Sequence, residues 1–348
     1  MISLLIVNYR SAALTAQAIR SARATTKSEL QIVVVDNSCD PEEQAKLVGI
    51  AEDLDKLVTH DTNRGYAGGI NSGREVCDGD VLVVSNPDVT FSDGALDRLA
   101  DEIDGDVAAA GPALFWDDAY EWLLPPGDLG TAREKIDTIL AGRSLPWFEQ
   151  RDRRRFLQRV KFWSLTKTTE TRMLSGAVMA IRVQDFDTIG GFDERFPLYF
   201  EEADFLRRIS EYRKRIVYVP SARCRHLFNQ SASQVAESAA ARYAQSELRY
   251  LEKWNGPWAA RMLKRLEKPL PAFVAPTSNS RAPILRGDFV IEASPLESFS
   301  TAAGRFANRS DDFALPPDVL ASIRGSTFHL RSLVRATGEV LATVKISA

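Results

Sequence analysis

The chain has 348 residues, of which 45% are hydrophobic and 26% are charged, so it is long enough for one large or two ordinary folded domains. Its formal net charge of −3 gives no support to a nucleic-acid partner. The three cysteines are odd in number and far apart in sequence, which predicts neither a disulfide framework nor a cysteine-rich zinc site and fits a reducing cytoplasm.

The chain begins with an apolar run over residues 1–7. No basic segment precedes this run and no small-residue cleavage site follows it, so it predicts a first strand and not a signal peptide. No apolar run in the sequence reaches about 18 residues, and a membrane-spanning helix is therefore not expected.

Apolar runs and helical segments alternate over the first 112 residues. The apolar runs predict buried strands at residues 2–8, 31–36, 56–59, 80–85 and 107–111. Between them the sequence predicts helices at residues 12–24, 41–51, 66–76 and from Ser92 or Asp93 to about residue 103. Because the strands are apolar throughout, the alternation is typical of an α/β fold with a doubly wound, mostly parallel sheet that helices cover on both faces.

The middle of the chain, residues 115–170, is rich in aromatic residues and carries a basic stretch from Arg151 to Lys161. Regular elements follow, with strands expected at residues 171–183 and 215–219 and helices at residues 185–190, 201–212 and 236–263. A proline-rich linker is expected at residues 269–282. Beyond it, three short apolar runs predict a small β-rich C-terminal domain over residues 283–348, with strands at residues 288–293, 327–334 and 340–346.

Polar side chains follow three of the predicted strands. They are Asn8 with Tyr9, Asp36 with Asn37, and Asn86 with Asp88. Open α/β sheets bind ligands outside the carboxyl ends of their strands, so these groups are candidate ligand-binding residues. A carboxylate such as Asp88 suits a hard divalent cation that is shared with a substrate phosphate, although Asn86-Pro87-Asp88 is also ordinary turn chemistry.

A glycine-rich loop over residues 63–73 leads into the helix before the strand at residues 80–85. Small residues let the backbone approach a ligand closely, and a helix N-terminus favours anionic groups. The spacing of the glycines matches neither the dinucleotide-binding fingerprint nor a P-loop. The alternative interpretation is that these glycines pack the helix against the sheet.

Three carboxylates, those of Glu201, Glu202 and Asp204, fall within four residues. Glu201 and Asp204 are spaced to share a helix face, whereas Glu202 points elsewhere. Like charges held together in a cleft raise a pKa, which suits a general base, while the alternative is a helix first turn whose acids are favoured by the macrodipole. His226 follows the next strand, as a further metal ligand or as a structural histidine.

Taken together, these segments resemble family 2 of the inverting nucleotide-sugar glycosyltransferases, which have the GT-A fold. The resemblance covers residues 1–230 and rests on the order and spacing of short motifs, which include Ser175-Gly176-Ala177 and residues 190–194. It implies a GT-A domain over residues 1–268, with a nucleotide-sugar half at residues 1–112 and an acceptor half at residues 113–268.

The resemblance also implies the binding roles. Asp36 would hold the nucleobase, and Asp88 and His226 would bind Mg²⁺ or Mn²⁺ beside the diphosphate of the nucleotide-sugar donor. The other residues implied in donor binding are Asn8, Tyr9, Asn37, Asn63, Arg64, Gly65, Gly69, Asn71 and Asn86.

The family motif at the acidic cluster is Glu-Asp, and this chain has Glu201-Glu202 instead. Glu202 stands at the position of the family's aspartate, so the resemblance favours it as the catalytic base, with Glu201 second, and Asp204 is the third residue implied in catalysis. The base would take the proton of an acceptor hydroxyl as the hydroxyl attacks the anomeric carbon in a single displacement. Residues implied in acceptor binding are Gly176, Arg208 and Trp163.

Asn86 stands where the family motif has its first aspartate, as in the subgroup that resembles rhamnosyltransferases. This implies dTDP-L-rhamnose as the donor, while UDP-linked galactofuranose, N-acetylglucosamine and glucose stay open. The implied acceptor is a saccharide or a polyprenyl-diphosphate-linked saccharide, in cell-surface polysaccharide synthesis.

Two other functions are open to a chain of this pattern. A sugar nucleotidyltransferase would need a glycine-rich loop after the first strand, where residues 8–11 contain no glycine. A non-catalytic nucleotide-sugar binding protein is the second alternative, against which Asp88 and the intact acidic cluster argue.

The basic segment over residues 151–163 mixes arginines with aromatic side chains. It predicts either a solvated helix face or a contact with an anionic membrane surface. On the second interpretation the protein is cytoplasmic and peripheral at the inner face of the cell membrane.

Overall fold

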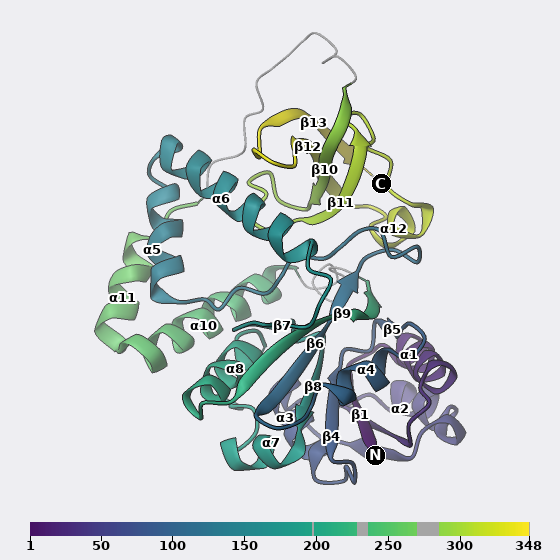
Figure 1. The fold of residues 1–348 in the computed structure, drawn as a ribbon. Coiled ribbons are helices and arrows are strands. Elements are labelled where there is room, and N and C mark those ends of the chain that lie inside the picture. Colours follow the sequence, from purple (N-terminus) through teal and green to yellow (C-terminus); the bar gives the residue numbers. More distant parts are fainter. Residues whose placement is uncertain (197, 228–235, 270–284, 348) are drawn as a thin grey trace.

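The computed structural model describes residues 1–196, 198–227, 236–269 and 285–347 (Figure 1). The linker expected at residues 269–282 lies outside the described residues except for its first residue. Within the described chain, no helix combines the length and the apolar character needed to cross a bilayer.

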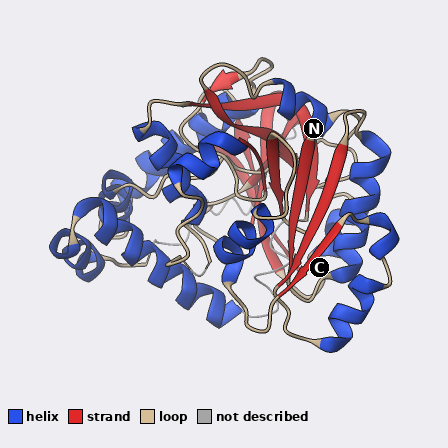
Figure 2. Cartoon of the chain, turned by 90° about the horizontal axis from the view of Figure 1, so that it is seen from below, coloured by secondary structure: helices blue, strands red, loops and turns tan. Residues whose placement is uncertain are grey.

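The described residues form a nine-stranded mixed sheet in the order β3-β2-β1-β4-β8-β6-β9-β5, with β7 paired to β9 (Figures 1 and 2). The first four strands of this order run parallel, and β8 pairs antiparallel with both β4 and β6. The strands are β1 (Ile2–Asn8), β2 (Leu30–Asp36), β3 (Lys56–Thr59), β4 (Val81–Ser85), β5 (Val89–Phe91), β6 (Val107–Phe115), β7 (Thr169–Glu170), β8 (Val178–Arg182) and β9 (Arg215–His226).

Helices cover both faces of this sheet (Figure 2). Residues of β1 divide between two large apolar clusters, with Leu4 and Ile6 on one face and Leu5 and Val7 on the other. The helices are α1 (Ala12–Thr25), α2 (Pro41–Val48), the 3-10 turn η1 (Ala51–Asp53), α3 (Gly65–Arg74), α4 (Ala95–Asp101), α5 (Ala132–Ala141), α6 (Leu145–Trp163), α7 (Val183–Ile189), α8 (Glu201–Glu211), α10 (Ala236–Asn255) and α11 (Pro257–Leu266). The predicted α/β fold with a doubly wound, mostly parallel sheet is confirmed.

The structure corrects several element boundaries. Of the strand expected at residues 171–183, only β8 is present, and β5 was not predicted. The strand expected to end at residue 219 continues to His226, because a register shift after Pro112 leaves residues 220–222 of β9 without partners on β6. The helix expected over residues 236–263 is two helices, since Gly256 adopts φ 85° and Pro257 starts a new one.

A separate antiparallel sheet, in the order β11-β10-β12-β13, forms the C-terminal part of the chain (Figure 1). Its elements are β10 (Arg286–Ser294), β11 (Ala303–Arg309), α12 (Pro317–Ser322), β12 (Thr327–Val334) and β13 (Val340–Ser347). Val290 and Leu333 of this sheet share an apolar cluster with Phe156, Val160 and Trp163 of α6. The small sheet is therefore packed on the body of the protein through α6.

A buried cluster of charges lies in the same interface. The Arg331 guanidinium, fully buried, forms ion pairs with Asp152 of α6 at 2.7 Å and with Glu292 of β10 at 2.8 Å. Glu292 also pairs with Arg159 of α6 at 2.7 Å. Two carboxylates and two guanidiniums thus share one site, so each charge has an opposite charge beside it.

We expect Arg331→Met to destabilise the protein, because it leaves Asp152 without its paired cation and Glu292 with only one. Breaking a buried ion pair from one side costs about 3–5 kcal/mol. Denaturant unfolding should show a loss of this size. The matched control is Arg335→Met, which removes a guanidinium that is 36% exposed and pairs with Asp288 at the surface, and it should cost less than about 1 kcal/mol. Equal losses in the two variants would contradict the importance of the buried cluster.

Candidate active site

The turn after β4 brings Asp88 against His226. β5 pairs antiparallel with the end of β9, with Val89 opposite His226. The Asp88 Oδ1 atom lies 3.3 Å from His226 Nε2, and the Asp88 side chain is only 5% exposed. Asp88 Oδ1 is buried and accepts no hydrogen bond from the described residues. A buried carboxylate oxygen without a hydrogen-bond donor, beside an imidazole nitrogen, is the arrangement that a cation would complete.

These two residues fit the donor set of a divalent metal, one oxygen and one nitrogen. Across the described part of the chain no group of three or more histidine, cysteine or acidic side chains surrounds a single point. Any metal at Asp88 and His226 would therefore take its remaining ligands from a bound diphosphate and water, as Mg²⁺ does in many phosphate sites.

Glu201 and Glu202 open helix α8 at the edge of the same site. Phe200 precedes them with φ 69°, a left-handed conformation that is strained for a bulky residue. Glu201 is 4% exposed, and its Oε2 atom has no hydrogen-bond partner in the described structure. Burial, and next the charge of Glu202, raises the pKa of Glu201 well above its usual value. Glu202 is half-buried, and burial raises its pKa as well.

Tyr66 connects the acidic pair to the turn after β4, and it was not singled out in the sequence. Its hydroxyl donates a hydrogen bond to the Gly176 carbonyl at 2.9 Å. Burial raises the Tyr66 pKa well above its usual value, and the charges of Glu201, Glu202 and Asp88 add to the effect. Tyr66 is therefore buried within the electrostatic reach of carboxylates from both the turn after β4 and the start of α8.

Gly176 lies directly against the side chain of Glu202. A Cβ atom added to Gly176 would come within 3.3 Å of the Glu202 Cγ atom. The loop at residues 175–177 is held in place because the backbone N–H of Asn86 donates to the Ala177 carbonyl at 2.9 Å. The structure thus brings Gly176, predicted for acceptor binding, beside the predicted base and the turn of Asn86.

The ends of β1 and β2 form a second polar group. The Asn8 amide donates to Asp36 Oδ1 at 3.0 Å, and the Ser38 backbone amide donates to the same oxygen at 3.0 Å. Glu43, which the sequence gave no reason to select, accepts from the Ala12 amide at the start of α1 at 2.6 Å. Asn8 and Asp36 are buried, while Tyr9 is 48% exposed above them. Of these residues, Tyr9 has the ring that a planar base can reach from solvent.

Most of the loop expected at residues 63–73 is helix, because α3 begins at Gly65, and its glycines pack α3 against the sheet as the alternative interpretation predicted. A Cβ atom on Gly69 would lie 2.9 Å from Val7 and 3.0 Å from Asn37. The Asn37 side chain in turn donates to the Gly65 carbonyl at 2.7 Å. Gly65 itself has φ 71°, a left-handed conformation. This packing sets the N-terminus of α3 beside the end of β2.

Three predicted donor-binding side chains of this loop have partners within the protein. Asn63 accepts from the Gly65 amide at 2.8 Å, and Arg64 pairs with Glu194 at 3.1 Å. Asn71 exchanges two hydrogen bonds with the backbone of Phe192, each 2.9 Å long. Arg64 remains 40% exposed, so of the three it is the side chain best placed to exchange its surface partner for a phosphate.

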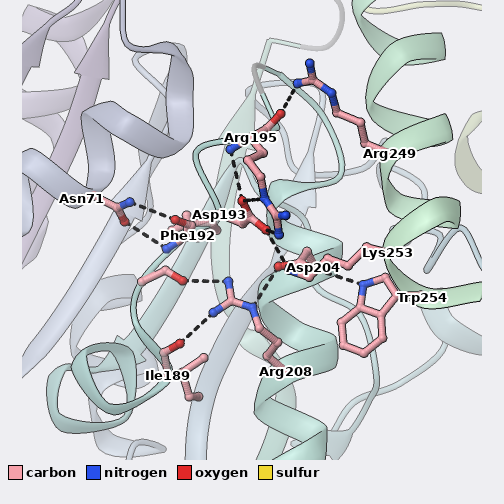
Figure 3. A network of polar contacts seen from close by, with 11 residues as sticks. Asn71, Ile189, Phe192, Asp193, Arg195, Asp204, Arg208, Arg249, Lys253 and Trp254 are labelled. Carbon is pink, nitrogen blue, oxygen red and sulfur yellow. Dashed lines mark hydrogen bonds and ion pairs between the residues drawn. The ribbon is translucent and has the colours of Figure 1, made fainter. Parts of the chain in front are cut away.

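Asp204 and Arg208, the other predicted residues of α8, form a polar network behind the site (Figure 3). Asp204 Oδ2 accepts from Arg208 Nε at 2.8 Å, and Asp204 Oδ1 pairs with Lys253 at 2.7 Å. The Trp254 indole donates to the same oxygen at 3.0 Å. Both carboxylate oxygens of Asp204 are therefore engaged, unlike those of Glu201.

Trp163 lies apart from the acidic pair, at the junction with the C-terminal sheet. Its indole donates to the Leu124 carbonyl at 2.9 Å, and its ring is 6% exposed. Trp163 borders an open cavity of about 420 Å³ between the large sheet and β11. Arg223 lines this cavity with its guanidinium 4.7 Å from the Tyr120 ring centroid.

The basic segment over residues 151–163 is helix α6, and several of its arginines have acidic partners within the protein. Arg151 and Arg154 pair with Asp137, at 3.2 and 2.7 Å. Arg155 pairs with Asp128 at 2.6 Å. These ion pairs join α6 to α5 and to the segment that holds Asp128.

Comparison with known proteins gives two results on the sequence. The profile of Glycosyl transferase family 2 matches residues 3–174. The N-acetylglucosaminyl-diphospho-decaprenol L-rhamnosyltransferase of Mycobacterium tuberculosis, in two strains, is 26% identical over 196 residues, which are 52% of this chain. The match spans 58% of the length of these curated relatives.

Two solved structures share the GT-A fold at 14% sequence identity. The mannosyltransferase PcManGT from Pyrobaculum calidifontis, in complex with GDP-Man and Mn²⁺, matches with a TM-score of 0.50 over 76% of this chain and 73% of that one. GalNAc-T7 with UDP, GalNAc and Mn²⁺ matches with a TM-score of 0.51 over 73% of this chain and 48% of that one. The sheet order and the covering helices are therefore those of a GT-A fold.

We expect Glu201→Gln to stabilise the protein at neutral and alkaline pH. Because the folded state raises the pKa of Glu201, it binds this proton more tightly than the unfolded chain does. The stability that this proton provides is present at low pH and is lost as pH rises from about 4.3, the ordinary glutamate pKa, towards the raised value. Glutamine avoids that loss, so thermal unfolding should favour the variant at about pH 8 and show little difference near pH 4.

The matched control is Glu211→Gln, an exposed residue at the end of the same helix. It should leave the unfolding midpoint unchanged at both pH values. A Glu201→Gln variant that is no more stable than wild type at alkaline pH would show that Glu201 is not held in a desolvated state.

Proposed function

Residues 3–174 belong to glycosyltransferase family 2, and from that premise we propose that this protein is an inverting glycosyltransferase. It moves a sugar from a nucleotide-sugar donor to a hydroxyl group of a saccharide acceptor. The observation that supports this best is that Asp88, which lies beside His226, and the acidic pair Glu201 and Glu202 all act electrostatically on the buried Tyr66.

The acidic pair supplies the base. Glu202 is half-buried against Gly176, so its carboxylate can reach an acceptor that enters along the loop at residues 175–177. The acceptor oxygen bonds to the anomeric carbon while Glu202 takes the hydroxyl proton, and the bond from that carbon to the diphosphate breaks with inversion. Burial keeps the pKa of Glu202 raised, which makes its carboxylate a stronger base once it is ionised.

Asp88 and His226 hold Mg²⁺ or Mn²⁺ in this proposal. The metal would neutralise the nucleoside diphosphate as it departs. Asn86 in place of an acid leaves one negative charge fewer at the metal, so Asp88 and the donor diphosphate provide most of the anionic ligands. The donor binds along the ends of β1, β2 and β4, with Asp36 and Tyr9 at the nucleobase.

The donor we propose is dTDP-L-rhamnose, and the acceptor is a polyprenyl-diphosphate-linked saccharide. The Mycobacterium tuberculosis relative, named as a rhamnosyltransferase acting on N-acetylglucosaminyl-diphospho-decaprenol, supports both choices. UDP-linked sugars are the alternative donors. Reaction at the inner face of the cell membrane would give the enzyme both a water-soluble donor and a lipid-linked acceptor.

We expect Glu202→Gln to lower kcat by about 10²–10⁴-fold, the usual effect of losing a general base. The measurement is release of nucleoside diphosphate in a coupled assay, over a panel of dTDP- and UDP-sugars with a saccharide acceptor. The dTDP-L-rhamnose arm should give the highest rate. Glu201→Gln is the comparison at the same helix end, and it should retain more activity than Glu202→Gln.

Two outcomes would contradict this assignment. If Glu202→Gln kept full activity while Glu201→Gln lost it, the base would be Glu201. If no nucleotide sugar released its diphosphate although one bound tightly, the protein would be a non-catalytic binding protein.

We expect the metal to bind through Asp88, with a readout that does not need turnover. Mn²⁺ together with dTDP or UDP should raise the unfolding midpoint of the wild type, since ligand at 100 times its Kd stabilises by about 2.7 kcal/mol. In Asp88→Asn the part of this shift that depends on Mn²⁺ should disappear. Asp93→Asn, an exposed carboxylate close by in sequence, is the control. An equal Mn²⁺ effect in Asp88→Asn and wild type would remove Asp88 from the metal site.

A further inference from the structure

Helix α11 presents an apolar and basic face to solvent. Of its ten residues only Ala260 is buried. Trp258, Met262 and Leu266 are 76%, 42% and 41% exposed. Their spacing of four residues places all three on one side of the helix, where a core-facing helix would have its buried stripe. The stripe here faces outward instead.

Basic side chains flank this stripe. Arg261 and Arg265 are exposed and lie three residues after Trp258 and Met262, so they border the same face. Residues 257–268 contain four basic side chains and one acid, Glu267. Glu267 pairs with Lys135 at 2.6 Å and with Lys264 at 2.8 Å, so its charge is already neutralised within the protein. The outward charge of α11 is therefore positive.

The opposite side of α11 is anchored to the body of the protein. Lys135 of α5 is 5% exposed and pairs with Glu247 of α10 at 2.7 Å and with Glu267, just beyond α11, at 2.6 Å. Arg143 donates to the Leu266 carbonyl at 2.8 Å. Figure 1 shows α11 beside α5 and α10, on the side of the molecule away from α1 and α2. The outward face is thus held in a fixed orientation.

The corner between α5 and α6 adds further exposed apolar groups. Arg143 lies in this corner, so its bond to Leu266 joins the corner to the end of α11. The exposed apolar side chains of the corner are Ile136 at 47%, Leu140 at 38%, Leu145 at 55% and Trp147 at 39%. We call the outward face of α11, formed by Trp258, Met262 and Leu266 with Arg261 and Arg265, the α11 surface.

We propose that the α11 surface binds an anionic phospholipid bilayer, lying in the plane of the headgroups. An outward tryptophan and aliphatic stripe between arginines has the chemistry of an interfacial amphipathic helix. A second copy of this chain is disfavoured as the occupant, because a two-fold contact would bring together two copies of the same positively charged patch. Anionic headgroups match both the charge and the apolar stripe.

This proposal replaces α6 by α11 as the membrane-facing helix. Several arginines of α6 pair with acids at 2.6–3.2 Å, whereas Arg261 of α11 lies at the longer distance of 3.8 Å from Glu252, and α11 adds the exposed ring of Trp258. It does not rest on the proposed transferase activity, because vesicle binding is measured without substrate.

The test is flotation of the full chain with vesicles of phosphatidylcholine alone and of phosphatidylcholine mixed with phosphatidylglycerol. We expect binding to the mixed vesicles that weakens as salt is raised. The variant Trp258→Ser/Met262→Ser/Leu266→Ser should bind the mixed vesicles at least about tenfold more weakly than wild type, since it lacks the apolar stripe. A second variant, Arg261→Glu/Arg265→Glu, keeps the stripe and should lose about fivefold for each positive charge removed.

The matched control is Leu296→Ser/Leu320→Ser, which removes two leucines that are 47% and 39% exposed near the C-terminal sheet. It should bind the mixed vesicles as wild type does. Unfolding midpoints and light scattering of each variant report its folding and its oligomeric state.

Three results would overturn the proposal. The first is a wild type that does not float with the mixed vesicles. The second is that the serine and glutamate variants of α11 both float as well as wild type. The third is a wild type that is dimeric and binds no vesicles, with a serine variant that is monomeric. The last result would assign the α11 surface to contact between copies of the chain.

Discussion

The ion pair between Asp204 and Arg208 fixes the helix on which the acidic site is built. Arg208 gives its remaining donors to the carbonyls of Ile189 at 2.9 Å and Gly191 at 2.7 Å, so it joins α8 to the loop before it (Figure 3). Asp204 reaches the other way, to Lys253 of α10. This pair thus joins α8 to the loop at residues 189–191 and to α10. The position of α8 in turn sets the positions of Glu201 and Glu202 at its start. A charge network with every member paired can offset its own desolvation in this way.

The contrast within helix α8 separates structural from chemical acids. Asp204 is fully buried and has a cation or donor at each oxygen. Glu201, one turn earlier, is almost as buried, and its Oε2 atom has no hydrogen-bond partner among the described residues. Burying a carboxylate oxygen without a hydrogen-bond partner destabilises the folded state, so folding does not explain its presence. Such groups concentrate where a ligand or a reaction supplies the missing partner, and Asp88 shows the same property on the facing strand end.

The sequence was informative where structure is local and uninformative where it is not. Apolar runs located β1, β3 and β12 to the residue. The signal is continuous for β1, because every one of its residues is buried. The three residues of β5 are too few to leave one, yet their pairing with β9 sets Asp88 beside His226. The motif pattern named both residues through family resemblance, but no periodicity shows that a bulge at residues 220–222 carries β9 onward to reach β5.

The same limit explains the residues that were missed or placed in other roles. In the sequence Tyr66 is one aromatic residue among glycines. Only the folded structure brings it within electrostatic reach of three carboxylates.

Arg151, Arg154 and Arg155 looked like a basic surface because their partners, Asp137 and Asp128, come from an earlier segment. The basic residues of α11 are fewer, so the sequence did not predict a basic surface there. Yet a charge acts on a partner outside the protein only when no internal acid neutralises it, which makes the pairing of each arginine more informative than the number of arginines.

The buried cluster at Arg331 has a consequence beyond the stability of the C-terminal sheet. Arg305 and Phe306 of β11 line the cavity that Trp163 borders, and β11 is held to α6 through its own sheet and through the close packing of Gly304 on the Trp163 ring. Asp152 and Arg159 of α6 are the residues that Arg331 and Glu292 engage. The shape of this cavity therefore depends on the ion cluster, although none of the four charged residues lines it. A change at Arg331 would alter the cavity by moving one of its walls relative to the other, and it would leave the carboxyl ends of β1, β2 and β4 as they are.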